Sequence, residues 1–407
     1  MTRIVALLVG IALLAAVLQD AFEVMLLPRR VQRRWRFVRF YFSQTWWLWS
    51  IFGRRRSTGA PRERLLSIYG PLSMALLFAI WSFLLILGFG LVQWAVQAQV
   101  GQAAPRLGDQ IYMSGVTFFT LGYGDVVPHT DAARIVSVLE AGAGFGLIAV
   151  VIGYLPVLYQ LFSRREAHVL QLDARAGSPP TAMTLLKRHA ESGGLDQVDD
   201  VLRTWEIWGA ELLESHLSYP MLAYYRSQHD DQSWLGALVA IMDVCTLVLI
   251  GVEEVRPLQA RMTFAMARHV VIEIARSLGV STNRTSEGSR LSHEDYGKLL
   301  TCFEEADLSW NGGPEAEQTL AAIRATYEPA CEALGDYLLI PLPGWIPADN
   351  TPDHWDRGPR GIIARRLLDG LADGSIGAQG PTRRSIVGRI RDQVRPEKLS
   401  TREDGGS

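Results

Sequence analysis

Five consecutive residues offer backbone groups that could bind a dehydrated cation: Thr120, Leu121, Gly122, Tyr123 and Gly124. The two glycines can adopt left-handed conformations that residues with side chains resist. Alternating them with ordinary residues lets successive backbone carbonyls turn toward one axis, and the Thr120 hydroxyl can add an innermost ring of oxygens. Such rings replace the hydration shell of an ion. The stretch therefore predicts ion coordination by backbone carbonyls, without covalent chemistry.

The run Thr-Leu-Gly-Tyr-Gly-Asp, which ends at Asp125, resembles the selectivity filter of tetrameric potassium channels. In that family, one pore loop per chain lies between two membrane helices. The resemblance covers about residues 66–162, and it implies K⁺ bound at Thr120, Leu121, Gly122 and Tyr123, with Asp125 at the outer mouth. It also implies a homotetramer, because the carbonyls of one loop cannot surround an ion. A glycine-rich turn that spells these residues by chance is the alternative, and the flanking segments argue against it.

The segment before the filter departs from the best-known bacterial pattern. Tyr112 and Met113 stand where a tryptophan pair is common, and Val116 replaces a carboxylate that can brace the filter. Because of these differences, the sequence does not predict whether the filter inactivates slowly. They do not affect the prediction of selectivity. A pore helix is expected from Gly108 or Asp109 to about Phe119, with the negative end of its dipole directed at a cavity cation.

Two apolar segments flank the pore loop. The predicted outer helix runs from Ser67 to Trp94, where Trp81 and Trp94 are possible interface anchors. The predicted inner helix covers residues 132–162, with Glu140 as its only acid. Together with the loop they form the expected pore module.

Glycines and a proline interrupt the predicted inner helix at Gly142, Gly144, Gly146 and Pro156. Glycine weakens a helix interior, and proline removes a backbone hydrogen bond. A gating hinge is one interpretation, since Gly144 lies where the family usually has its hinge glycine. Close helix packing through small residues is the other. A dinucleotide-binding reading of Gly144-x-Gly146-x-x-Ala149 fails because the motif lies inside a membrane span without a preceding strand.

The N-terminal segment, residues 1–27, is apolar enough to span a bilayer. A signal peptide is the alternative, because the apolar run follows Arg3 closely. Eleven arginines follow between Arg29 and Arg64, and cleavage would export this basic loop against the positive-inside rule. We therefore expect a retained helix with its N-terminus outside.

Residues 28–65 mix arginines with many aromatic residues, as expected of a cytosolic segment at an anionic membrane surface. The candidate lipid-surface residues are Arg30, Arg33, Arg36 and Arg39. Their spacing of three also occurs in voltage-sensor helices. A sensor needs countercharges on neighbouring helices, however, and only one span precedes this segment. Nucleic-acid binding would use similar residues, but the flanking spans favour lipid, and we expect no nucleic-acid partner.

The region after the pore module, residues 163–376, is predicted to be a helical cytosolic domain, and residues 377–407 a disordered tail. Residues 234–252 are apolar with Asp243 at their centre. They could form a fourth span, but acids flank both ends, so a buried core helix is the preferred interpretation. Strands do not alternate with helices, which argues against the nucleotide-binding domain common on such channels.

The sequence thus predicts an all-α protein of the cell membrane: a two-helix pore module with a re-entrant loop, an extra N-terminal helix and an all-α cytosolic domain. The eight histidines and three cysteines never take metal-ligand spacing, so we expect no enzyme and no cofactor beyond the transported K⁺. Expected partners are three further copies, anionic lipids and an unknown cytosolic ligand. Alternatives are a membrane-anchored sensor or scaffold with a non-conducting pore, and an enzyme in the cytosolic domain.

Overall fold

The computed structural model describes residues 1–25, 37–97, 104–229, 231–282, 290–313 and 315–348. This part of the chain is all-helical, which confirms the predicted fold class of an all-α membrane protein. The elements are α1 (Thr2–Met25), α2 (Phe37–Arg54), α3 (Ala60–Val96), α4 (Leu107–Phe118), α5 (Asp131–Ala176), α6 (Ala182–Glu191), η1 (Leu195–Gln197), α7 (Val198–Ser218), η2 (Pro220–Tyr224), α8 (Trp234–Ile250), α9 (Pro257–Leu278), α10 (His293–Glu305), α11 (Ala316–Arg324) and α12 (Glu328–Leu338).

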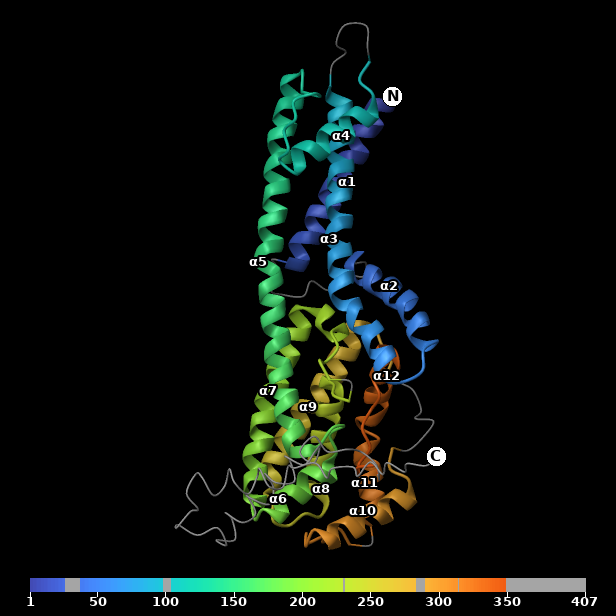
Figure 1. Cartoon of the computed structure of the whole chain (residues 1–407), viewed down its shortest axis with the longest axis vertical. Coiled ribbons are helices and arrows are strands. Elements are labelled where there is room, and N and C mark those ends of the chain that lie inside the picture. The colour runs from blue at the N-terminus through green and yellow to red at the C-terminus, as the bar shows by residue number, and fades with distance from the viewer. Residues whose placement is uncertain (26–36, 98–103, 230, 283–289, 314, 349–407) are drawn as a thin grey trace, which may run out of the picture. The chain divides into compact units, whose positions relative to one another are not determined.

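Three helices in the described residues, α1, α3 and α5, are long and apolar enough to cross a membrane. Helix α1 packs along α3 through two glycines, because a Cβ atom added at Gly10 would lie 2.8 Å from the carbonyl oxygen of Gly88. Small residues allow this close approach of membrane helices. The short α4 packs between the upper parts of α3 and α5 (Figure 1). Helices α3, α4 and α5 are thus the helices of the predicted pore module, and α1 packs against α3.

Both long pore-module helices extend beyond their predicted ends. Helix α3 begins at Ala60 rather than Ser67, because Pro61 in the first turn favours a helix start. Helix α5 continues from the predicted end at residue 162 to Ala176, and it ends only where Gly177 takes a positive φ of 80°. The inner helix therefore runs without interruption into the region that was predicted to be the cytosolic domain, residues 163–376.

Trp81 was expected as a possible interface anchor, and this expectation is wrong. Its side chain is completely buried, and its indole nitrogen donates to Asp20 Oδ2 of α1 at 3.0 Å. A carboxylate is costly in lipid unless it has hydrogen-bond partners. Asp20 and Trp81 thus join α1 to α3, whereas Trp94 donates to the carbonyl of Pro105 near the start of α4.

The C-terminal end of α12 receives donors from α2 and α3. The last carbonyls of a helix have no partners within that helix. Here Trp46 donates to the Tyr337 carbonyl at 2.8 Å, and Arg62 donates to the Leu339 carbonyl at 2.9 Å. Arg54 and Arg226 bond the neighbouring carbonyls of Asp336 and Leu338. Positive charge also suits a helix C-terminus. These contacts fix the α2–α3 hairpin to the C-terminal helices.

The short helix η2 connects the inner helix α5 to the outer helix α3. Arg165 of α5 is buried and donates to the carbonyls of Leu222 and Tyr225, each at 2.8 Å. On the opposite side, the ring of Tyr224 packs against the rings of Trp46 and Tyr69. Any movement of the lower part of α5 must therefore be accommodated by η2 and its contacts with α2 and α3.

Helix α8 is the centre of the C-terminal helical region. Fifteen of its seventeen residues are buried, and it is shorter than the helices that could cross a membrane. The preferred interpretation of a buried core helix is therefore confirmed. Asp243, at its middle, is completely buried and pairs with Arg290, with 2.6 Å between Oδ2 and Nη2. The charge at the centre of this apolar helix is thus neutralised within the protein core.

Candidate ion-conduction site

Helix α4 ends at Phe118, two residues before the predicted filter begins at Thr120. Its last turn is closed by backbone bonds from the Thr120 nitrogen to the Thr117 carbonyl, at 3.0 Å, and from the Leu121 nitrogen to the Val116 carbonyl, at 2.8 Å. These bonds satisfy carbonyls that a helix end leaves free. They also turn the chain sharply, so that residues 121–124 follow the helix as a non-helical stretch.

The φ angles of the predicted filter alternate in sign. Thr120, Gly122 and Gly124 have φ values of 59°, 62° and 78°, whereas Leu121 and Tyr123 do not take positive φ. Such alternation turns successive carbonyls to the same side of the chain. The glycines were expected to behave in this way, but Thr120 was not. A residue with a branched side chain is strained in the left-handed region, and such strain often occurs at functional sites.

In a single chain, the predicted filter is uncovered. Residues 119–125 are exposed, and Tyr123 retains 67% of its accessible surface. A face of α5 is exposed as well, and its large apolar residues are Ile135, Val138, Leu139, Phe145, Ile148, Ile152, Leu155, Val157 and Tyr159. Lipid can cover apolar side chains, but it cannot satisfy exposed backbone carbonyls. This arrangement is what a pore shared by several chains requires.

A buried carboxyl group lies behind the pore helix. Glu140 of α5 is completely buried and bonds to the hydroxyl of Ser114 in α4, which itself donates to the Ile86 carbonyl of α3 at 2.8 Å. Nearby, Gln93 of α3 donates to Ser137 of α5 at 2.9 Å. Polar groups in a membrane domain usually bond across helices in this way. Although the family's carboxylate position is Val116 here, Glu140 supplies a carboxyl group to α4 from the inner helix.

The outer end of the filter has its own polar contacts. The Asp125 carboxylate accepts a hydrogen bond from the backbone nitrogen of Val126 at 3.0 Å, and it also bonds the Tyr112 side chain. Tyr112 is one of the two residues that stand where a tryptophan pair is common in the resembling channels, and it lies beside the predicted filter.

The hinge candidates differ in their surroundings, although α5 is continuous through all of them. A Cβ atom added at Gly144 would lie 2.3 Å from the Phe118 carbonyl oxygen, at the end of α4. At Gly142 and Gly146 it would meet nothing within 4 Å. Gly144 is thus required for close packing between the inner helix and the pore helix. Gly142, Gly146 and Pro156 keep the hinge interpretation.

Replacing Gly144 with alanine is expected to reduce ion flux through displacement of the end of α4. Overpacking of a tight contact typically costs about 1–3 kcal/mol. For the melting temperature, Gly142→Ala and Gly146→Ala are matched controls, because they add the same methyl group to the same helix in open space. Tracer flux into liposomes is compared between Gly144→Ala and the wild type only, since Gly142 and Gly146 remain hinge candidates. If Gly144→Ala matched both controls, the contact with Phe118 would not exist in the working protein.

Of the candidate lipid-surface residues, Arg30, Arg33 and Arg36 lie outside the described residues. Arg39 is exposed, and its guanidinium donates to the carbonyl of Arg276, in the last turn of α9, at 3.3 Å. A cation at this position suits the helix dipole. Arg39 therefore connects α2 to the C-terminal helices, in addition to any contact with lipid.

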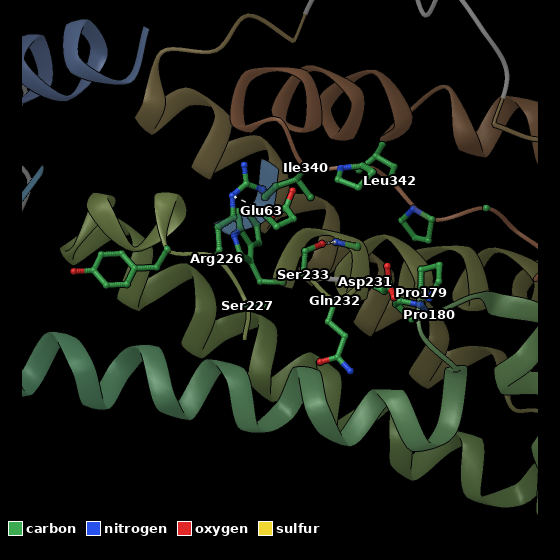
Figure 2. Close-up of a pocket in the computed structure, with 16 residues that line it drawn as sticks. Glu63, Pro179, Pro180, Arg226, Ser227, Asp231, Gln232, Ser233, Ile340 and Leu342 are labelled. Atoms are coloured by element: carbon green, nitrogen blue, oxygen red, sulfur yellow. Dashed lines mark hydrogen bonds and ion pairs between the residues drawn. The ribbon is translucent and has the colours of Figure 1, made fainter. Parts of the chain in front are cut away.

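A cavity of about 180 Å³ lies where four segments meet (Figure 2). Its lining includes Glu63 in the first turn of α3, Pro179 and Pro180 after α5, residues 225–227 and 231–234 before and at the start of α8, and residues 340–344 after α12. Arg226 is buried there, 3.8 Å from Glu63. Burial lowers the pKa of Arg226 to about 10, which leaves it charged at neutral pH. In the described part of the chain, no group of side chains could hold a metal ion.

Comparisons with known proteins support an ion channel. A family model described as "Ion channel" matches residues 73–160, the region that contains α4, the predicted filter and most of α3 and α5. An uncharacterized membrane protein YdjJ of Bacillus subtilis is 26% identical over 215 residues, which are 51% of this chain and 60% of the relative. Protein LctB of Geobacillus stearothermophilus is 30% identical over 84 residues, 18% of this chain and 62% of the relative.

The chain thus spans about three fifths of the length of each of these relatives. No solved structure matches it. Together, the family match and the apolar helices support a membrane protein with an ion-channel module of the pore-loop type.

Sequence reasoning missed three features of this site: the positive φ of Thr120, the bond between Glu140 and Ser114, and the contact of Gly144 with Phe118. A signal existed only for Glu140, since a single acid in an apolar helix requires a partner. The identity of that partner depends on how α4 and α5 pack.

Proposed function

We propose that four copies of this chain form a potassium-selective channel. The observation that carries the proposal is the alternating sign of φ from Thr120 to Gly124, which directs successive carbonyls to one side. Four such stretches around an axis would create rings of oxygens that replace the hydration shell of K⁺. The C-terminal ends of four α4 helices would direct partial negative charge at the ion before it enters. Asp125 would add negative charge at the outer mouth.

The pore would be regulated through α5. This helix extends from the filter region to Ala176 in one piece, and Arg165 attaches it to η2. A rearrangement of the C-terminal helices could therefore pull on the inner helix directly. In the proposed topology the protein lies in the cell membrane, with the N-terminus outside and the C-terminal helices in the cytosol, as the arginines between residues 29 and 64 favour.

A potassium flux assay tests this function. The purified full-length protein, reconstituted into liposomes loaded with K⁺, is expected to let K⁺ leave when a protonophore balances charge. With Na⁺ as the only internal cation, the release is expected to be at least about tenfold slower. Empty liposomes are the control for leakage of ions through the lipid. Liposomes with the variant Gly124→Ala are the control for selectivity. Absence of flux from a well-folded tetramer would favour the alternative of a sensor or scaffold with a non-conducting pore.

Ligand control of the channel is the second candidate, and the cavity in Figure 2 favours it. The cavity touches the beginning of α3 and the segment that follows α5, so a molecule bound there would contact both sides of the pore module. Its proline-rich walls and its few polar groups suit a small molecule. We propose this cavity as the location for the expected unknown ligand.

A further inference from the structure

An apolar stripe on α3 leads to a groove between two arginines. Leu65, Ile68, Leu72 and Leu76 recur at intervals of three and four residues, so they share one face of the helix. Ile68, Leu72 and Leu76 are 53%, 47% and 47% exposed. Such a continuous row of exposed aliphatic side chains requires an apolar partner.

The groove lies at the Leu65 end of this stripe. It has a volume of about 380 Å³, and it is lined by Trp49, Phe52, Arg55, Arg56 and Leu65. Trp49 closes the α2–α3 hairpin by donating to the Leu65 carbonyl at 3.1 Å. The groove therefore combines an aromatic and aliphatic floor with two cationic side chains, and it forms at the junction of α2 and α3.

Both arginines of the groove are available to an anion. Arg55 and Arg56 are exposed, and neither pairs with a carboxylate in the residues that the structure describes. Their neighbour Arg54 differs, because it donates to the Asp336 carbonyl of α12. Guanidinium groups bind phosphate oxygens well, often through two parallel hydrogen bonds.

The depth of the groove matches the headgroup layer of a membrane. From Trp94, near the pore-helix end of α3, to Leu65 there are 29 residues, or about 43 Å of helix. A bilayer with its headgroups is about 40–45 Å thick. With Trp94 at one interface, the groove lies at the other. From Ile68 to Leu76 the stripe continues for about 12 Å along the helix, from the groove toward the hydrocarbon core.

We propose that this groove and stripe bind one anionic phospholipid. Its phosphate lies between Arg55 and Arg56, and one acyl chain lies along Ile68, Leu72 and Leu76. This site is separate from the surface predicted around Arg30 to Arg39, at the other end of α2. Helices α2 and α3 also donate hydrogen bonds to the end of α12. A bound lipid would therefore stabilise the contacts between the membrane helices and the C-terminal helices.

Native mass spectrometry of the full-length protein in detergent tests the proposal. Dioleoylphosphatidylglycerol and dioleoylphosphatidylcholine are added at equal concentrations, so that only the headgroup differs. At roughly 1 kcal/mol per arginine, the variant Arg55→Gln/Arg56→Gln is expected to bind the anionic lipid about 30-fold more weakly. The matched control Arg203→Gln/Arg261→Gln removes two exposed arginines from α7 and α9, and it should bind like the wild type.

A second variant, Ile68→Ser/Leu72→Ser, tests the acyl chain. It is expected to lose affinity for the dioleoyl lipid while its weaker affinity for a dihexanoyl phosphatidylglycerol stays unchanged. Equal lipid binding by the Arg55→Gln/Arg56→Gln variant and its control would overturn the proposal. The proposal would also be overturned if Ile68→Ser/Leu72→Ser lost the tetramer but still bound the lipid, since the stripe would then face another copy of the chain. Neither outcome depends on whether the protein conducts K⁺.

Discussion

Replacing Gly124 with alanine is expected to abolish discrimination between K⁺ and Na⁺. Gly124 has a φ of 78°, and a Cβ atom added there would meet nothing within 4 Å of the same chain. The backbone conformation is therefore the constraint. For a residue with a side chain the left-handed region costs roughly 1–2 kcal/mol, and a tetramer would bear that cost four times in one ring. The chain would relax to negative φ, which turns a carbonyl away from the ion.

Gly108→Ala is the matched control for this variant. Gly108 also has open space around its Cβ position, but its φ is not in the left-handed region. Reversal potentials under mixed K⁺ and Na⁺ gradients measure the discrimination in both variants. Gly108→Ala is expected to behave like the wild type. A selective Gly124→Ala channel would mean that residues 120–124 do not form the filter.

The variant Arg290→Met is expected to destabilise the C-terminal helices by about 3–5 kcal/mol, because it leaves a buried carboxylate without its cation. Arg290 bonds both oxygens of Asp243 and lies 3.2 Å from Glu328. Burial opposes the guanidinium charge, but the Asp243 carboxylate outweighs it and raises the pKa of Arg290. Tyr327 also donates to Asp243, at 2.6 Å. The substitution therefore disrupts a fully bonded cluster at the middle of α8.

The melting temperature of the full-length protein in detergent, followed by tryptophan fluorescence, reports this loss. A decrease of about 10 °C is expected for a region of this size. Lys298→Ala removes an exposed cation that pairs with Glu294, and it should shift the temperature by less than about 2 °C. The double variant Asp243→Asn/Arg290→Met, which removes both charges of the pair, should melt above Arg290→Met. If it did not, the cost would come from lost packing and not from an unpaired charge.

The sequence by itself determined the fold class and the three helices able to cross a membrane, and it favoured the burial of α8. Each of these depends on local composition. An apolar run long enough to span a bilayer is visible in the sequence, and the acids that flank residues 234–252 favour a buried core helix over a fourth span. The predicted filter is local in the same sense, because two alternate glycines permit the required backbone angles wherever the chain places them.

Only the tertiary structure decided which residues support the predicted filter and what joins it to the rest of the chain. Glu140 reaches Ser114 across 26 residues, and Trp46 reaches Tyr337 across 291. Only the structure distinguishes the roles of Gly142 and Gly144. In the same helix, Gly142 faces open space, whereas Gly144 faces the Phe118 carbonyl. Contacts of this kind depend on how the helices pack. Packing is set by the shapes of whole surfaces, and the spacing of residues along one chain does not reveal it.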